Sequence, residues 1–232
     1  MIRYKHIFFD LDHTLWDFET NSNATMAELY EEHNLSGRGI PSYDEFFSVY
    51  SAINEKLWDR FRKGYINRNE LRIKRFTQTF LDFKLCDDAL CQTLSERFLV
   101  ILPTKTALFP GAIEVLDYLK EKQYPLHLIT NGFEETQKLK LEHSGIGHYF
   151  THIVTSESAG SLKPHRAIFD YALQLSNTTA AESIMIGDTL EVDILGAQQI
   201  GMDQVYFAPG DVQAGVSPTY TIKSLAELKS IL

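Results

Sequence analysis

Two aspartates stand two positions apart where the first apolar run of the chain ends. The run is KHIFFD, residues 5–10, and Asp12 follows Asp10 after a single leucine. Residues i and i+2 of an extended chain point to the same side, so the two carboxylates can share one site. One carboxylate could attack phosphorus while the other serves as general acid and base. Taken alone, the pair is equally compatible with an Asx turn that caps a helix.

The other apolar runs also end in side chains that can handle a phosphate or a metal ion. In chain order these ends carry Thr130, Asn131, Lys163, Asp188 and Asp193. In an open α/β sheet, ligands bind beyond the carboxyl ends of the strands. We therefore predict that these residues meet Asp10 and Asp12 in one crevice, which favours a phosphate-handling site over a helix cap.

The charges at these strand ends indicate a cation. Four carboxylates in one crevice would repel one another and would also repel a phosphate. Hard carboxylate oxygens at this density favour a hard divalent cation, and Mg²⁺ suits a site that handles phosphate. Lys163 would add one more positive charge. The sequence has no group of His and Cys ligands that would indicate zinc.

The elements that position these residues alternate along the chain. Short apolar runs at residues 5–10, 125–130, 151–155, 183–187 and 204–207 predict strands buried on both faces. Helical patterns lie between them, at residues 111–122, 134–144, 164–175 and 191–200, with Pro164 expected as the first residue of its helix. The order predicts an α/β fold with a doubly wound, Rossmann-like parallel sheet of about five core strands.

One long gap interrupts the alternation after the first strand. It reads as four helices at residues 21–33, 42–62, 67–83 and 87–99, two of them opened by the capping pairs Ser42/Glu45 and Asn67/Glu70. We therefore expect an α-helical bundle inserted into the sheet domain. The predicted boundaries are residues 1–16 and 106–232 for the Rossmann-like core and 17–105 for the inserted helical cap.

Composition narrows the classes of partner. The 232-residue chain has a net charge of −9, which would repel a nucleic acid polymer at long range. It has no apolar stretch long enough to span a membrane and no signal peptide, so we expect a cytoplasmic protein. A small phosphorylated metabolite remains a suitable partner. The sequence leaves monomer and dimer open.

One segment of this acidic chain has a local excess of positive charge. Residues 59–76 carry seven Lys or Arg against two Asp or Glu. Such a cluster is either the solvated face of a helix or a patch that faces substrate, and both interpretations stay open.

The segments DLDHT, LITNG, LKP and GDTLEVD resemble the four ordered motifs of the haloacid dehalogenase-like hydrolase superfamily. The likeness covers the whole chain, because the inserted helices resemble that family's type 1 helical cap. It implies a phosphatase that uses Mg²⁺ and an aspartyl-phosphate intermediate. Haloacid dehalogenases proper lack an acid at the place of Asp12, which disfavours carbon–halogen chemistry here.

The resemblance also implies a role for each motif residue. Asp10 would be the nucleophile and Asp12 the general acid and base. Thr130, the backbone after it at Asn131, and Lys163 would bind the phosphoryl oxygens. Mg²⁺ would be held by Asp10, the backbone carbonyl of Asp12 and Asp188, with Asp193 supporting the metal shell or Lys163.

A finer likeness concerns the substrate. The segments DLDHTLWDFE and GYINRNELRIKRF resemble the subfamily of 5′-nucleotidases that act on pyrimidine monophosphates. Trp16 could stack on a nucleobase or pack inside the protein, and Arg72 or Arg75 could reach a sugar or phosphate; His13 is assigned no role. A sugar-phosphate phosphatase, a phosphomutase and, more distantly, a non-catalytic regulator that binds a phosphate ligand are the alternatives.

Overall fold

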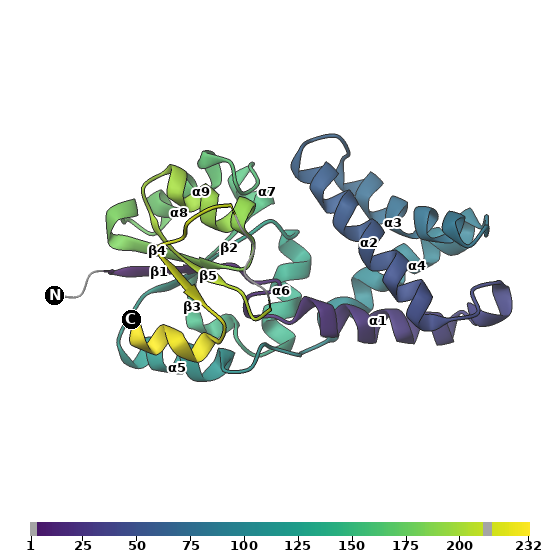
Figure 1. Ribbon diagram of the computed structural model, residues 1–232, viewed down its shortest axis with the longest axis horizontal. Helices are drawn as coiled ribbons and strands as arrows, with labels where there is room; N and C mark the ends of the chain where they lie inside the picture. The colour runs from purple at the N-terminus through teal and green to yellow at the C-terminus, as the bar shows by residue number, and fades with distance from the viewer. Residues whose placement is uncertain (1–3, 211–214) are drawn as a thin grey trace. The chain divides into compact units, whose positions relative to one another are not determined.

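The computed structural model describes residues 4–210 and 215–232. The chain forms two compact units. One unit combines Met1–Phe18 with Thr106–Leu232, and the other consists of Glu19–Lys105. The first unit carries the sheet, and the second is made of helices (Figure 1).

The first unit is built on a six-stranded parallel sheet with the order β3-β2-β1-β4-β5-β6. Its strands are β1 (His6–Phe9), β2 (Leu126–Thr130), β3 (Phe150–Thr155), β4 (Ser183–Gly187), β5 (Asp203–Phe207) and β6 (Tyr220–Ile222). All five predicted strands are present, and the doubly wound α/β prediction with an inserted helical bundle is confirmed. The prediction of about five strands missed β6, which has only three residues.

The register of the sheet places the end of β1 between the ends of its neighbours. Phe9 pairs with Leu128 of β2 on one side and with Ile186 of β4 on the other. Directly after this pairing, the backbone N–H of Asp10 donates to the carbonyl of Ile186 at 2.8 Å. Asp10 therefore stands at the centre of the carboxyl edge of the sheet.

Helices cover both faces of the sheet (Figure 1). On one side α5 (Ala112–Glu121) lies beside the C-terminal helical turn Leu225–Ser230, and on the other lie α8 (Arg166–Leu175) and α9 (Leu195–Gln199). The buried core on the α8 side joins Phe8 and Met185 of the sheet to Phe169 of α8. The remaining helices of this unit are α6 (Glu134–His143) and the short α7 (Ser156–Ala159).

Two predicted helix starts differ from the structure. Helix α8 begins at Arg166 and not at Pro164, because Pro164 lies in a turn closed by the His165 N–H bond to the Leu162 carbonyl. The helix expected at 191–200 opens with a π-helical turn, Leu190–Ile194, before α9 begins.

The second unit contains α1 (Phe18–Glu32, whose first residue belongs to the sheet unit), α2 (Tyr43–Arg62), α3 (Arg68–Asp82) and α4 (Asp88–Ile101). Its core includes the buried rings of Tyr50, Phe76 and Phe98, whose centroids lie 5.7–6.0 Å apart. The reciprocal capping box of Asn67 and Glu70 opens α3 as predicted. At α2, the Ser42 side chain accepts from the Glu45 N–H.

Among the described residues, the helices fall short of the length and apolar character that a membrane crossing needs. Both cysteines are free thiols; Cys86 is exposed and Cys91 is buried.

Candidate active site

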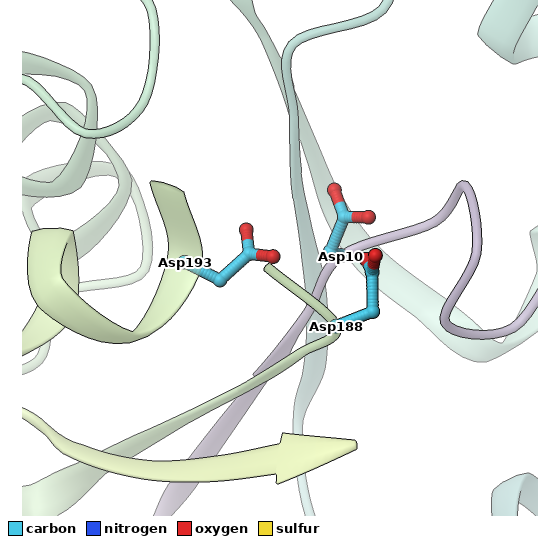
Figure 2. Close-up of side chains that lie close together, drawn as sticks. All are labelled: Asp10, Asp188 and Asp193. Carbon is cyan, nitrogen blue, oxygen red and sulfur yellow. The ribbon is translucent and has the colours of Figure 1, made fainter. Parts of the chain in front are cut away.

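Three aspartates gather at the carboxyl edge of the sheet (Figure 2). Asp10 follows β1, Asp188 follows β4, and Asp193 lies one helical turn later. Each offers a carboxylate oxygen, and these oxygens lie within 4.8 Å of one another. The sequence analysis predicted that these three residues would meet, and the structure brings them together.

The carboxylate of Asp10 shares a buried lysine with Asp193. The Nζ of Lys163 lies 2.5 Å from Asp10 Oδ1 and 2.6 Å from Asp193 Oδ1. Burial favours a neutral amine, but the charges of Asp10 and Asp193 outweigh it and raise the pKa of Lys163. Burial, and after it the charges of Asp193 and Asp188, raise the pKa of Asp10, an effect that Lys163 opposes. A further cation beside Asp10 would favour its carboxylate form.

Asn131 fixes the segment that carries this lysine. Its side-chain oxygen accepts from the backbone N–H of Lys163 at 2.7 Å, and its amide donates to the Lys163 carbonyl at 3.0 Å. The Asn131 backbone was predicted to bind phosphate, and its side chain braces the Lys163 backbone.

The π-helical turn that carries Asp193 presses its carboxylate against the end of β4. The Asp193 Oδ2 accepts from the Thr189 N–H at 3.1 Å. A Cβ added at Gly187 would lie 2.4 Å from the Asp193 carboxyl carbon, so only glycine leaves room there. Asp193 therefore supports Lys163 and the β4 loop together.

Asp188 belongs to the three-aspartate cluster and is itself held by hydroxyl groups. Thr14 donates to its Oδ1 at 3.2 Å, and Thr189 donates to its Oδ2 at 3.1 Å. Burial, followed by the charge of Asp193, raises the pKa of Asp188 to about 6. Thr14 is fully buried and was not singled out from the sequence.

The donor set suits a hard divalent cation. Asp10 and Asp188 offer carboxylate oxygens, which are the ligands that Mg²⁺ prefers. Their raised pKa values show that the site disfavours uncompensated negative charge. Both carboxylate oxygens of Asp193 accept hydrogen bonds, one from Lys163 and one from Thr189. This suits a supporting role better than direct ligation of a metal ion.

Asp12 is held by two side chains of α6. Lys140 Nζ lies 2.5 Å from Asp12 Oδ1, and Gln137 Nε2 donates to Asp12 Oδ2 at 2.9 Å. Gln137 also donates to the hydroxyl of Thr130 at 2.7 Å. Sequence reasoning missed both α6 residues. The available signal was their i, i+3 spacing beside Leu141, which puts polar and apolar groups on one buried face.

Two aromatic residues after Asp12 lie within the sheet unit. Trp16 is fully buried, and the Lys140 ammonium lies 4.3 Å from the centre of its ring. Phe18 contacts the rings of Trp16 and His13. His13 has a left-handed backbone, with φ 63°, in the turn between Asp12 and Trp16.

The predicted substrate arginines belong to α3 of the helical unit. Arg75 is buried, with its guanidinium 4.1 Å from the ring centre of Phe98. The backbone carbonyl of Arg72 accepts from the Ser95 hydroxyl at 3.0 Å. In the basic segment, Lys63 pairs with Asp59 and Lys74 with Glu70.

Comparison with known proteins places the chain among hydrolases. Residues 4–201 match the model of the haloacid dehalogenase-like hydrolase family. The chain is 32% identical to the HAD-hydrolase YfnB of Bacillus subtilis, over 100% of this chain and 97% of YfnB. It is 31% identical to the pyrimidine 5′-nucleotidase YjjG of Escherichia coli, over 100% of this chain and 99% of YjjG. It is 32% identical to the glyceraldehyde 3-phosphate phosphatase of Pyrococcus abyssi, over 89% of this chain and 82% of that phosphatase.

A solved structure supports the same relationship. The crystal structure of YfnB bound to magnesium matches with a TM-score of 0.89 and 31% identity, covering 99% of this chain and 98% of YfnB. The match extends over both units of the chain.

Proposed function

This chain belongs to the haloacid dehalogenase-like hydrolase family, and from that premise we propose that it is a Mg²⁺-dependent phosphomonoesterase acting through an aspartyl phosphate. Membership of the family confirms the predicted hydrolase class and supports phosphatase activity. The observation that carries the proposal is the arrangement of Asp10, Asp188 and Asp193 around the buried Lys163.

Asp10 is the nucleophile in this proposal. Its carboxylate attacks the phosphorus of the substrate, a bond forms between Asp10 and phosphorus, and the bond to the leaving oxygen breaks. The Lys163 ammonium, within hydrogen-bond distance of Asp10, holds the nucleophile in place and offsets the charge of the phosphoryl group. Thr130, at the end of β2, supplies a hydroxyl at the same edge of the sheet.

Asp12 moves the protons. As the bond to the leaving group breaks, Asp12 gives its proton to the departing oxygen, and it then takes a proton from the water that hydrolyses the aspartyl phosphate. Asp10, the Asp12 carbonyl and Asp188 would hold Mg²⁺, which supplies positive charge at the transferred phosphoryl group when it is bound. The magnesium in the YfnB structure supports this assignment.

For the substrate we propose a pyrimidine nucleoside 5′-monophosphate. The proposal rests on the likeness to YjjG and on the segments around Trp16 and in α3. The proposed specificity residues are Trp16 of the sheet unit and Arg72 and Arg75 of α3. A sugar phosphate is the second candidate, because the glyceraldehyde 3-phosphate phosphatase has a similar identity to this chain, 32%, over a smaller share of it, 89%.

A substrate panel tests the proposal. Phosphate release with Mg²⁺ is measured from nucleoside 5′-monophosphates, sugar phosphates and p-nitrophenyl phosphate. Pyrimidine monophosphates are expected to lead. If sugar phosphates lead, the mechanism stands and the nucleotidase assignment is wrong. If no phosphate is released from any of them, the phosphatase proposal is wrong, and product analysis would then distinguish a phosphomutase.

A further inference from the structure

We propose that Lys140, together with Gln137, is a positioning residue that orients Asp12 for proton transfer. This inference rests on the proposed phosphatase function and extends it to the helix that follows β2. Lys140 and Gln137 each contact a different oxygen of the Asp12 carboxylate, at 2.5 Å and 2.9 Å. Two donors on two oxygens fix both the position and the plane of the carboxylate.

The sequence brings these donors to Asp12 through the geometry of α6. Residues three apart on a helix lie on the same face, so Gln137 and Lys140 point in the same direction. Both are buried, although α6 is otherwise rich in charged residues. Burying a lysine is costly unless a charged partner compensates, and Asp12 is that partner here.

The rings of Trp16 and Phe18, which follow Asp12, make cation–π contacts with the Lys140 ammonium. The Lys140 ammonium lies 4.3 Å from the ring centre of Trp16 and 5.4 Å from that of Phe18. A cation over an aromatic face is stabilised by the ring, most strongly by tryptophan. Trp16 therefore limits where the Lys140 ammonium can lie, and through it where Asp12 can lie.

Gln137 links the same carboxylate to the phosphate-binding residue. Its amide donates to Thr130 Oγ1 at 2.7 Å as well as to Asp12. It also packs against Gly132, where an added Cβ would lie 2.4 Å from the Gln137 amide carbon. The spacing between Thr130 and Asp12 is thus set by one side chain that has little room to move.

This arrangement predicts a defect that depends on the leaving group. Asp12 is needed as an acid when the departing oxygen is a poor leaving group, as in a nucleotide or sugar phosphate. The p-nitrophenolate ion leaves without being protonated. Loss of Asp12 orientation should therefore lower kcat/KM for the first substrates much more than for p-nitrophenyl phosphate. Its effect on the later hydrolysis of the aspartyl phosphate, which both substrates share, enters kcat alone. General damage to the site should slow both equally.

The test compares Lys140→Met, which keeps the length of the side chain and removes the ammonium, with wild type. The matched control is Lys138→Met, which removes an exposed lysine of the same helix that pairs with Glu134 at the surface. For each protein kcat and KM are measured with Mg²⁺ on uridine 5′-monophosphate and on p-nitrophenyl phosphate. The ratio kcat/KM reports the step in which the leaving group departs.

Lys140→Met is expected to lower kcat/KM for the nucleotide by about tenfold or more, and that for p-nitrophenyl phosphate by less than about threefold. Lys140→Arg should recover part of the loss, and Lys138→Met should match wild type. Equal losses on both substrates, or no loss, would overturn the proposal. If Lys140→Met does not fold, Lys140→Gln is assayed against the same criteria.

The same measurements distinguish a failure of the Lys140 proposal from a failure of the proposed phosphatase function. If wild type releases phosphate from sugar phosphates and not from the nucleotide, the nucleotidase assignment fails, and the best alkyl phosphate takes the nucleotide's place in the comparison. If wild type hydrolyses both substrates and the two losses in Lys140→Met are equal, the phosphatase proposal stands and the role of Lys140 is wrong.

Discussion

The ammonium of Lys163 lies 2.5 Å from Asp10 Oδ1, and both groups are buried at the centre of the sheet edge. The charged partner of Asp10 is thus part of the folded protein before any substrate binds. A second contact of Lys163, to Asp193 at 2.6 Å, also holds the ammonium. The fold thus sets the position of the Asp10 carboxylate.

Replacing Lys163 by Met should therefore affect stability as well as activity. The substitution leaves Asp10 and Asp193 buried without their cation, and breaking a buried pair in this way costs about 3–5 kcal/mol. Urea denaturation in the presence of EDTA measures the loss, with Lys138→Met as the control. An unfolding free energy equal to that of wild type would show that the two aspartates do not depend on Lys163.

Replacing Asp10 by Asn should abolish turnover and leave the fold intact. The amide has nearly the same shape, and burial already disfavours the charged form of Asp10, as its raised pKa shows. The amide cannot form the acyl phosphate. Phosphate release and thermal unfolding are measured side by side with Asp170→Asn, a surface variant on α8. Residual phosphate release by the Asp10 variant above that of a mock preparation would rule out Asp10 as nucleophile.

Magnesium should stabilise the protein through Asp188. Its pKa of about 6 reflects burial and the nearby charge of Asp193, which a bound cation would relieve. At a hundredfold excess over its dissociation constant, a ligand that binds only the folded state adds about 2.7 kcal/mol. The thermal midpoint of wild type should rise with Mg²⁺, and that of Asp188→Asn should rise much less. A similar rise in both would place the metal elsewhere; Asp170→Asn serves as the control.

A stack of histidines on β1, β2 and β3 should make stability depend on pH. His127 is buried in β2, and its ring stacks on those of His6 and His152, each at 5.3 Å between centroids. Burial, and after it the charges of the two neighbours, lower its pKa from 6.5 to about 3. His127 is therefore neutral in the folded state and takes up a proton on unfolding. Its contribution is complete above pH 6.5 and is lost as the pH falls toward 3.

The free energy of unfolding is accordingly expected to fall between pH 7.5 and pH 5. The His127→Gln variant, which cannot titrate there, should lose about 1–2 kcal/mol less over the same interval. Denaturant titrations at both pH values measure the difference, with the exposed His148→Gln as control. Equal losses in wild type and His127→Gln would show that His127 is not the buried group that titrates.

The sequence predicted those parts of the molecule that depend on local pattern. The five longer strands are continuous apolar runs, and α3 opens with the Asn67/Glu70 capping box. Strand β6 was not predicted because it has only three residues, which differ in exposure, and it lies at the edge of the sheet beside β5. The start of α8 was misplaced because a proline is equally suited to the preceding turn.

The aspartates of the candidate site could be predicted because each follows a strand of one parallel sheet. The contacts of Asp12 could not, because they depend on which face of α6 is buried. Gln137 and Lys140 are separated from Asp12 by more than half of the chain, and no spacing rule links them. Their contacts with Asp12 become visible only in the folded structure.

The central place of β1 in the sheet has a consequence for how the polypeptide assembles. Strand β1 pairs with β2 and β4, and the whole helical unit is synthesised after β1 and before either of these partners. During synthesis, this apolar segment must wait for partners that emerge much later, whereas α1–α4 can form from one continuous stretch of chain. Closing such a long loop carries an entropic cost that grows only slowly with its length. The inserted helical unit therefore delays the pairing of β1 in the nascent chain and adds little to the free-energy cost of folding.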